Sequence, residues 1–151
     1  MESRSDKAVR LFESGCNCSQ AVFCAYCDLF GIDEELALRL SSGFGGGMGR
    51  MREVCGAFSG AVMVAGLKEW KLDIPDREAK KHIYEVVRKL NDEFRKENPS
   101  IVCKELLGLS KPPESATPDE RTPEYYKKRP CSEIVRSASL AVETVLFADE
   151  E

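Results

Sequence analysis

Apolar residues recur at helical spacing along this chain, and no stretch alternates apolar and polar residues for long enough to predict a strand. The clearest example is Ile83, Val87, Leu90 and Phe94, which are four, three and four residues apart and form one apolar stripe. With 151 residues, the chain is long enough for one hydrophobic core and too short for two. We therefore predict an all-α fold in which residues 1–151 form a compact single-domain helical bundle of about five to seven helices.

Composition and charge narrow the class of protein. The chain is 42% hydrophobic and 32% charged, which is typical of a folded, water-soluble domain. Its net charge of −4 argues against nucleic-acid binding, which needs clustered basic residues. The longest apolar-leaning stretch, Val54 to Leu67, is shorter than the about 20 residues that span a membrane. Because the charged N-terminus has no apolar signal-peptide core, we expect a cytoplasmic protein that does not span a membrane.

Helix boundaries follow from capping residues, glycines and prolines. The ranges expected to be helical are a short segment ending near Gly15, about Ser19 to Phe30, a segment capped by Asp33, about Arg52 to Trp70, about Asp76 to just before Pro99, a turn near Ser100 to Leu107, and Ser132 to Phe147. Two segments are expected to be irregular. Ser41 to Arg50 contains five glycines, and the proline-rich loop at 111–130 contains five prolines among charged residues.

The glycine-rich segment does not carry a nucleotide-binding motif. The spacing G-x-G-x-x-G is not completed from either Gly43 or Gly45, no predicted strand precedes it, and the G-x-x-x-x-G-K-[ST] pattern of a P-loop is absent. A serine-hydrolase site is not indicated either. The sequence GAFSG around Ser59 differs from G-x-S-x-G, and the only histidine, His82, is distant in sequence.

Seven cysteines are the unusual part of the composition. In a reducing compartment, many cysteines indicate redox chemistry or metal binding, and the odd count means that not all of them are paired. Cys55 is the most informative, because it follows the glycine-rich segment and falls in the first turn of a predicted helix. The helix dipole, with Arg50 and Arg52 nearby, would favour its thiolate, whereas the alternative is a buried capping residue. Gly56 and Gly60 then share one helix face, which favours tight helix packing within one chain or across a homodimer.

The order of these motifs resembles a known family. Cys18 within GCNCSQAV, the glycine run GFGGGMG, the hexapeptide CGAFSG starting at Cys55, and then Cys103 and Cys131 are similar to the C_GCAxxG_C_C family of redox-active proteins, over about Gly15 to Cys131. The resemblance implies a small redox-active protein with four characteristic cysteines, here Cys18, Cys55, Cys103 and Cys131. In that family some members carry selenocysteine, and genes often lie near transporter genes, which implies association with a transport system.

Three cysteines fall outside that pattern. Cys24 and Cys27 form a C-x-x-C inside a predicted helix, whereas thioredoxin-type motifs place the nucleophile at a helix N-terminus. We interpret these two as core or helix-surface thiols. A zinc site that combines them with Cys16 and Cys18 has no matched knuckle spacing.

Cys103 and Cys131 flank the proline-rich loop at 111–130, and two alternatives stay open for them. In the first, a disulfide or two buried thiols hold the loop closed. In the second, the loop carries Cys131 into a site that it shares with Cys18 and Cys55.

Thiol–disulfide chemistry is the favoured function. Cys55 would be the attacking thiolate and Cys18 its resolving partner, while Cys103 and Cys131 would form a second pair. Such an oxidoreductase needs no cofactor, and its partner would be a redox protein or a small thiol or disulfide.

Two other functions use the same residues differently. An iron–sulfur or zinc carrier would bind its metal through the same four cysteines, and the glycine run would supply backbone N–H groups to the cofactor (Gly45, Gly46 and Gly47). A non-catalytic helical interaction module would keep the cysteines only as core residues.

Overall fold

The structure, a computed structural model, describes residues 2–109 and 115–148, and the regular elements within these ranges are helical. They are α1 (Arg4–Glu13), α2 (Cys18–Cys24), η1 (Cys27–Phe30), α3 (Glu34–Ser41), η2 (Ser42–Phe44), α4 (Gly45–Met48), α5 (Gly56–Glu69), α6 (Asp76–Phe94), α7 (Cys103–Leu106), α8 (Pro123–Lys128) and α9 (Cys131–Leu146). The β pairing in the described part of the chain is one isolated antiparallel bridge, between Val54 and Val102. The predicted all-α fold is confirmed.

The helix count is slightly above the expected five to seven. Two short segments account for the difference. α4 is a glycine turn rather than a regular helix, because Gly46 and Gly47 have left-handed backbone conformations inside it. α8 lies within the range expected to be an irregular loop. It begins where Thr122 accepts a hydrogen bond from the Tyr125 amide and Pro123 occupies the first turn, a pairing that starts helices well.

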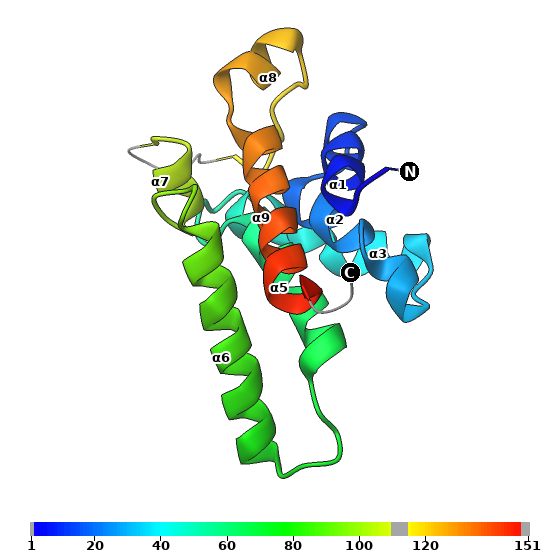
Figure 1. The fold of residues 1–151 in the computed structure, drawn as a ribbon. Helices are drawn as coiled ribbons and strands as arrows, with labels where there is room; N and C mark the ends of the chain where they lie inside the picture. Colours follow the sequence, from blue (N-terminus) through cyan, green and yellow to red (C-terminus); the bar gives the residue numbers. More distant parts are fainter. Residues whose placement is uncertain (1, 110–114, 149–151) are drawn as a thin grey trace.

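α5 lies at the centre of the bundle and packs against α2, α6 and α9. Figure 1 shows α5 and α6 as an antiparallel pair connected by the loop at 70–75, with α9 beside both. α1 packs on α9 and α2 and closes the other side of the core. Because α5 has neighbours on several sides, it is apolar around most of its circumference and carries its charges only at its end, at Lys68 and Glu69.

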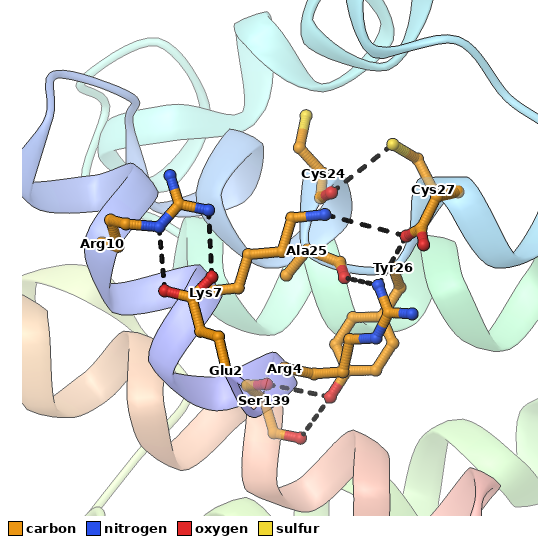
Figure 2. Close-up of polar contacts among 10 residues, drawn as sticks. Glu2, Arg4, Lys7, Arg10, Cys24, Ala25, Tyr26, Cys27 and Ser139 are labelled. Carbon is orange, nitrogen blue, oxygen red and sulfur yellow. Dashed lines mark hydrogen bonds and ion pairs between the residues drawn. The ribbon is translucent and has the colours of Figure 1, made fainter.

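The helix predicted over Ser19 to Phe30 is wrong in its length. α2 ends at Cys24, and the chain turns before η1, which ends at Phe30 with Gly31 as its C-cap, as expected. Three long-range hydrogen bonds hold this turn, one from Arg4 and two between Tyr26 and Ser139. Arg4 donates to the Ala25 carbonyl, and the buried Tyr26 hydroxyl is bonded to Ser139 of α9 (Figure 2). These partners are distant in sequence, so local periodicity could not show the break.

The helix predicted from Arg52 starts later, at Gly56, with Cys55 as its N-cap. Arg52 has a φ of 62°, a left-handed conformation that no helix accommodates. The Asn17 and Asp33 caps, the helix start at Asp76 and the final helix agree with the prediction within about two residues. α6 ends at Phe94, about four residues before the predicted end just ahead of Pro99. None of the helices in the described residues is long and apolar enough to cross a membrane.

Candidate functional site

Each of the four family-type cysteines lies at the start of a helix. Cys18, Cys103 and Cys131 are the first residues of α2, α7 and α9, and Cys55 is the N-cap of α5. All four line a single cavity of about 300 Å³. Backbone N–H groups at helix starts are unpaired within the helix and carry partial positive charge, so this arrangement surrounds the cavity with groups that favour anions.

The Val54–Val102 bridge places Cys55 beside Cys103. The Cys55 amide donates to the Ile101 carbonyl at 2.7 Å, and the Cys103 amide donates to the Glu53 carbonyl at 2.5 Å. The two cysteines are 48 residues apart in sequence, since 103 minus 55 is 48. The start of α5 is therefore fixed to the start of α7 by main-chain hydrogen bonds.

Small residues bring α2 against α5 within this chain. A Cβ at Gly60 would lie 2.8 Å from the Ser19 carbonyl oxygen, and one at Gly56 would lie 3.3 Å from the Cys18 Cβ. Gly60 therefore permits an approach that a side chain would prevent, and at Gly56 a side chain would force its neighbours to shift. The packing predicted for this glycine face occurs within the chain, and it places Cys18 next to the start of α5.

The glycine run forms one wall of the cavity. Gly45, Gly46 and Gly47 all line it. A Cβ at Gly47 would lie 2.7 Å from the Cys103 Cβ, and one at Gly45 would lie 2.4 Å from the Asn17 side chain. Close contact with neighbouring side chains is therefore sufficient to explain these glycines, and the predicted role in cofactor binding stays a prediction.

In this cavity, Cys131 and Cys18 each have the largest effect on the other's pKa. A hydrogen bond between the two side chains favours the thiolate of Cys131 and the protonated form of Cys18. This bond, together with the positive charges of Arg129 and Arg52, lowers the pKa of Cys131 to about 7 despite burial. The same bond and burial raise the pKa of Cys18 well above its usual range. The pair therefore holds one thiolate and one thiol near neutral pH.

The start of α5 does not give Cys55 the lowered pKa that its position predicts. Burial raises the pKa of Cys55 to about 12, although the nearby amides of Phe58 and Ala57 favour the thiolate. Burial also raises the pKa of Cys103, against the effect of Arg52, whose Nη1 donates to the Cys103 sulfur at 3.6 Å. A helix N-terminus is thus outweighed by desolvation at Cys55.

Arginines provide the charge in this cavity. Its lining includes Arg50, Arg52, Arg121 and Arg129, with Asp119 as the acidic residue among those described. Arg50 and Arg52 were expected near Cys55, whereas the other two were missed. Arg129 stands two residues before Cys131, which was a weak signal in the sequence, but nothing local indicated Arg121.

The described part of the proline-rich segment covers the cavity. Pro118 and Asp119 line it, and the Asp119 carboxylate pairs with Arg129 at 2.5 Å and with Arg50 at 3.5 Å. Arg121 anchors the segment by donating to the Phe12 and Cys16 carbonyls at 2.8 and 2.9 Å, respectively. The segment thus brings Cys131 into the cavity of Cys18 and Cys55, as the second alternative for this loop predicted. Residues 110–114 of the loop lie outside the described residues.

The remaining cysteines lie elsewhere. Cys24 and Cys27 are buried, and the Cys27 thiol donates to the Cys24 carbonyl at 3.4 Å (Figure 2). Burial raises the pKa of Cys24 to about 12 and also raises those of Cys27 and Cys16. All seven cysteines are free thiols in this structure.

The cysteine side chains are not arranged around one metal ion. Within residues 2–109 and 115–148, no three cysteine, histidine, aspartate or glutamate side chains are grouped as ligands of a metal ion. Binding of a metal by Cys18, Cys55, Cys103 and Cys131 therefore stays a prediction.

Comparison with known proteins agrees with the motifs. A family model described as "Putative redox-active protein (C_GCAxxG_C_C)" matches residues 16–145. Comparisons with curated proteins and with solved structures give no match. The match covers most of the chain and includes Cys18, Cys55, Cys103 and Cys131. The chain therefore belongs to the C_GCAxxG_C_C family.

Proposed function

We propose that this protein is a thiol–disulfide oxidoreductase in which Cys131 is the attacking thiolate and Cys18 the resolving thiol. The observation that carries the proposal is the hydrogen-bonded pair of thiols at the starts of α2 and α9, with a Cys131 pKa of about 7. A nucleophile with a pKa near the ambient pH combines a substantial thiolate fraction with retained nucleophilicity. Exchange also needs a second thiol nearby, and we assign this role to Cys18, which lines the same cavity and interacts with Cys131.

The reaction would have two steps. The Cys131 thiolate attacks one sulfur of a substrate disulfide, so that a mixed disulfide forms and one substrate thiolate leaves. The Cys18 sulfur then loses its proton and attacks the Cys131 sulfur, which forms the Cys18–Cys131 disulfide and releases the second substrate thiolate. The substrate disulfide gains two electrons and two protons, and the two protein thiols lose them. A redox protein or a small thiol would reduce the protein again.

This assignment exchanges the roles expected for Cys55 and Cys131. Cys55 is only 5% exposed, and no arginine is hydrogen-bonded to its thiol among the described residues, which agrees with its raised pKa. Cys131 has Arg129 and Arg52 as stabilising charges and a thiol donor as well. At neutral pH, Cys55 and Cys103 would therefore stay protonated members of the same cavity.

Trapping of the mixed disulfide tests the proposal. Reduced protein would be mixed with bis(2-hydroxyethyl) disulfide at pH 7, quenched with acid and mapped by mass spectrometry without reduction. We expect a Cys18–Cys131 disulfide in the unmodified chain and a stable adduct on Cys131 in Cys18→Ser. Cys27→Ser, which lies outside the cavity, serves as the control and should behave like the unmodified chain. An adduct that forms first on Cys55 would overturn the assignment and support the role predicted from sequence.

The carrier function shares the same cavity and has a separate test. Iron and zinc would be measured per chain in protein purified without oxygen or chelator. Near-stoichiometric metal that is lost in both Cys18→Ser and Cys131→Ser would favour a cluster or zinc over disulfide exchange. The thiol-exchange proposal expects metal-independent formation of the Cys18–Cys131 disulfide.

A further inference from the structure

The charge of the cysteine cavity is opposite to that of the chain. Four arginines and one aspartate are the charged side chains of its described lining other than the cysteines, which leaves an excess of three positive charges before the Cys131 thiolate is counted. The chain as a whole carries a net charge of −4. A positive pocket on an acidic protein selects for small anions, because the rest of the surface repels them and the pocket focuses the attraction.

Arg52 is a buried arginine with an unsatisfied hydrogen-bond donor in this cavity. It is 6% exposed and lines the cavity, and its Nε has no hydrogen-bond partner among the described residues. Its Nη1 donates only weakly, to the Cys103 sulfur at 3.6 Å. Arg50, which also lines the cavity, has an unpartnered buried Nε as well. Buried guanidinium donors without an acceptor are costly, and a bound oxyanion would satisfy them.

Two helices, α5 and α9, also favour an anion in this cavity. α5 and α9 both begin at the cavity, at Cys55 and Cys131, and their first N–H groups favour negative charge there. The covering segment already supplies one carboxylate, since Asp119 pairs with Arg129 and Arg50. A carboxylate is therefore chemically suited to these arginines, and an incoming anion would compete with Asp119 for them.

We infer that the substrate of this cavity is a small disulfide that carries an anionic group, such as a carboxylate, bound by Arg52 and Arg50 while its sulfur meets Cys131. This inference rests on the proposed thiol–disulfide exchange and adds the class of substrate. The electron and proton balance is that of the two-step exchange given above. The anionic group changes neither step and only orients the disulfide.

Rates of thiol–disulfide exchange with small disulfides of different charge test the preference for an anionic substrate. The probes are 2,2′-dithiodiacetate, which is anionic, bis(2-hydroxyethyl) disulfide, which is neutral, and cystamine, which is cationic. A free thiolate repels the anionic disulfide, so a simple exposed thiol should react with it most slowly. We expect this protein to react with it about tenfold faster than with the neutral one, as one charge-assisted hydrogen bond would give.

The ratio of anionic to neutral rates separates binding from reactivity. Arg52→Gln is expected to remove the preference, and any change in the Cys131 thiolate fraction cancels in the ratio. Arg39→Gln is the matched control, because Arg39 is exposed on α3 and pairs with Glu35 outside the cavity. A ratio below one in the unmodified chain, or a ratio unchanged by Arg52→Gln, would overturn the inference.

A second measurement does not depend on exchange. Adipate has the chain length of dithiodiacetate without its sulfurs, and 1,6-hexanediol is its neutral counterpart. Adipate should raise the melting temperature of the unmodified chain and hexanediol should not, because a ligand of the folded state stabilises it. Asp119→Asn should tighten adipate binding by freeing Arg50 and Arg129, and this variant removes no packing volume. Adipate binding without any disulfide exchange would support the anion site and refute the proposed function. Disulfide exchange without adipate binding and without a preference for the anionic disulfide would refute only the anion site.

Discussion

The two ends of α2 carry cysteines with opposite surroundings. Cys18 begins the helix in a cavity lined by arginines, while Cys24 ends it in the core beside Cys27. At the first end, a hydrogen bond and nearby cations stabilise a thiolate on Cys131. At the second end, burial and the neighbouring Cys27 together raise the pKa of Cys24 to about 12. The C-x-x-C pattern therefore marks the less reactive pair.

This contrast shows that cysteine spacing is a weaker guide to chemistry than the position of a cysteine on its helix and the charges around it. Near Cys24 and Cys27, the basic side chains form ion pairs with carboxylates. Arg4 and Lys7 pair with Asp28, and Arg10 pairs with Glu2, as the ion pairs near this turn in Figure 2 illustrate. In the cavity, the guanidinium groups instead stabilise the negative charge of the Cys131 thiolate.

Thiol reactivity should separate the two regions most strongly. With a Cys131 pKa of about 7, roughly half of this thiol is ionised at pH 7, whereas Cys24 is almost entirely protonated. Cys131→Ser is expected to slow the fastest iodoacetamide reaction by about a hundredfold or more, and Cys24→Ser to leave it unchanged. Stopped-flow alkylation followed by peptide mapping measures both. Equal slow rates at all seven cysteines would contradict the contrast.

Packing of α2 against α5 holds the start of α2, with Cys18, in place. Two glycine substitutions in α5 test this packing. Gly60→Ala should destabilise the fold by about 1–3 kcal/mol, because its Cβ would lie 2.8 Å from the Ser19 carbonyl oxygen. Gly66→Ala in the same helix meets nothing within 4 Å and should stabilise the fold by about 0.5–1 kcal/mol. Urea unfolding measures both values. Equal effects of the two substitutions would refute the close approach.

A substitution of Tyr26 tests whether the region after the C-terminal end of α2 contributes to stability alone and not to thiol reactivity. Its buried hydroxyl is bonded to Ser139 at 2.9 Å, and its ring stacks on Phe147. Tyr26→Phe keeps the ring and should cost about 1 kcal/mol in the free energy of unfolding. The Cys131 alkylation rate should not change, since Tyr26 does not line the cavity. A change in that rate would show that the two regions are coupled.

The smallest expected effect is a shift in the pH profile of Cys131. Its alkylation rate should rise from pH 5 to pH 9 with a midpoint near 7, because the reactive thiolate is lost as the pH falls below the pKa. Arg129→Gln removes a charge that favours the thiolate, so its midpoint should move to higher pH. Arg136→Gln is the control, because Arg136 lies on α9 with Cys131 but pairs with Asp6, and it should leave the midpoint in place. A midpoint that moves equally in both variants would exclude a specific effect of Arg129.

Local sequence was sufficient for most helices and insufficient for three boundaries. Asn17 and Asp33 cap α2 and α3 through side-chain hydrogen bonds to amides two or three residues ahead, so their positions are readable from the sequence. The end of α2 depends on Arg4 and Ser139, and the start of α5 depends on the left-handed conformation of Arg52. α8 has a local start signal at Thr122 and Pro123, which the density of prolines around it obscured.

The sequence by itself determined that the chain is helical, that glycines allow close contacts near Cys55, and that four cysteines follow a family pattern, with Cys55 at a helix start. These features depend on hydrogen bonds and side-chain periodicity within about four residues. Only the tertiary structure decided that the four helix starts meet in one cavity and that the lowered pKa belongs to Cys131 rather than Cys55. The physical reason is that a pKa depends on burial and on charges through space. Arg52 acts on Cys131 across 79 positions, since 131 minus 52 is 79.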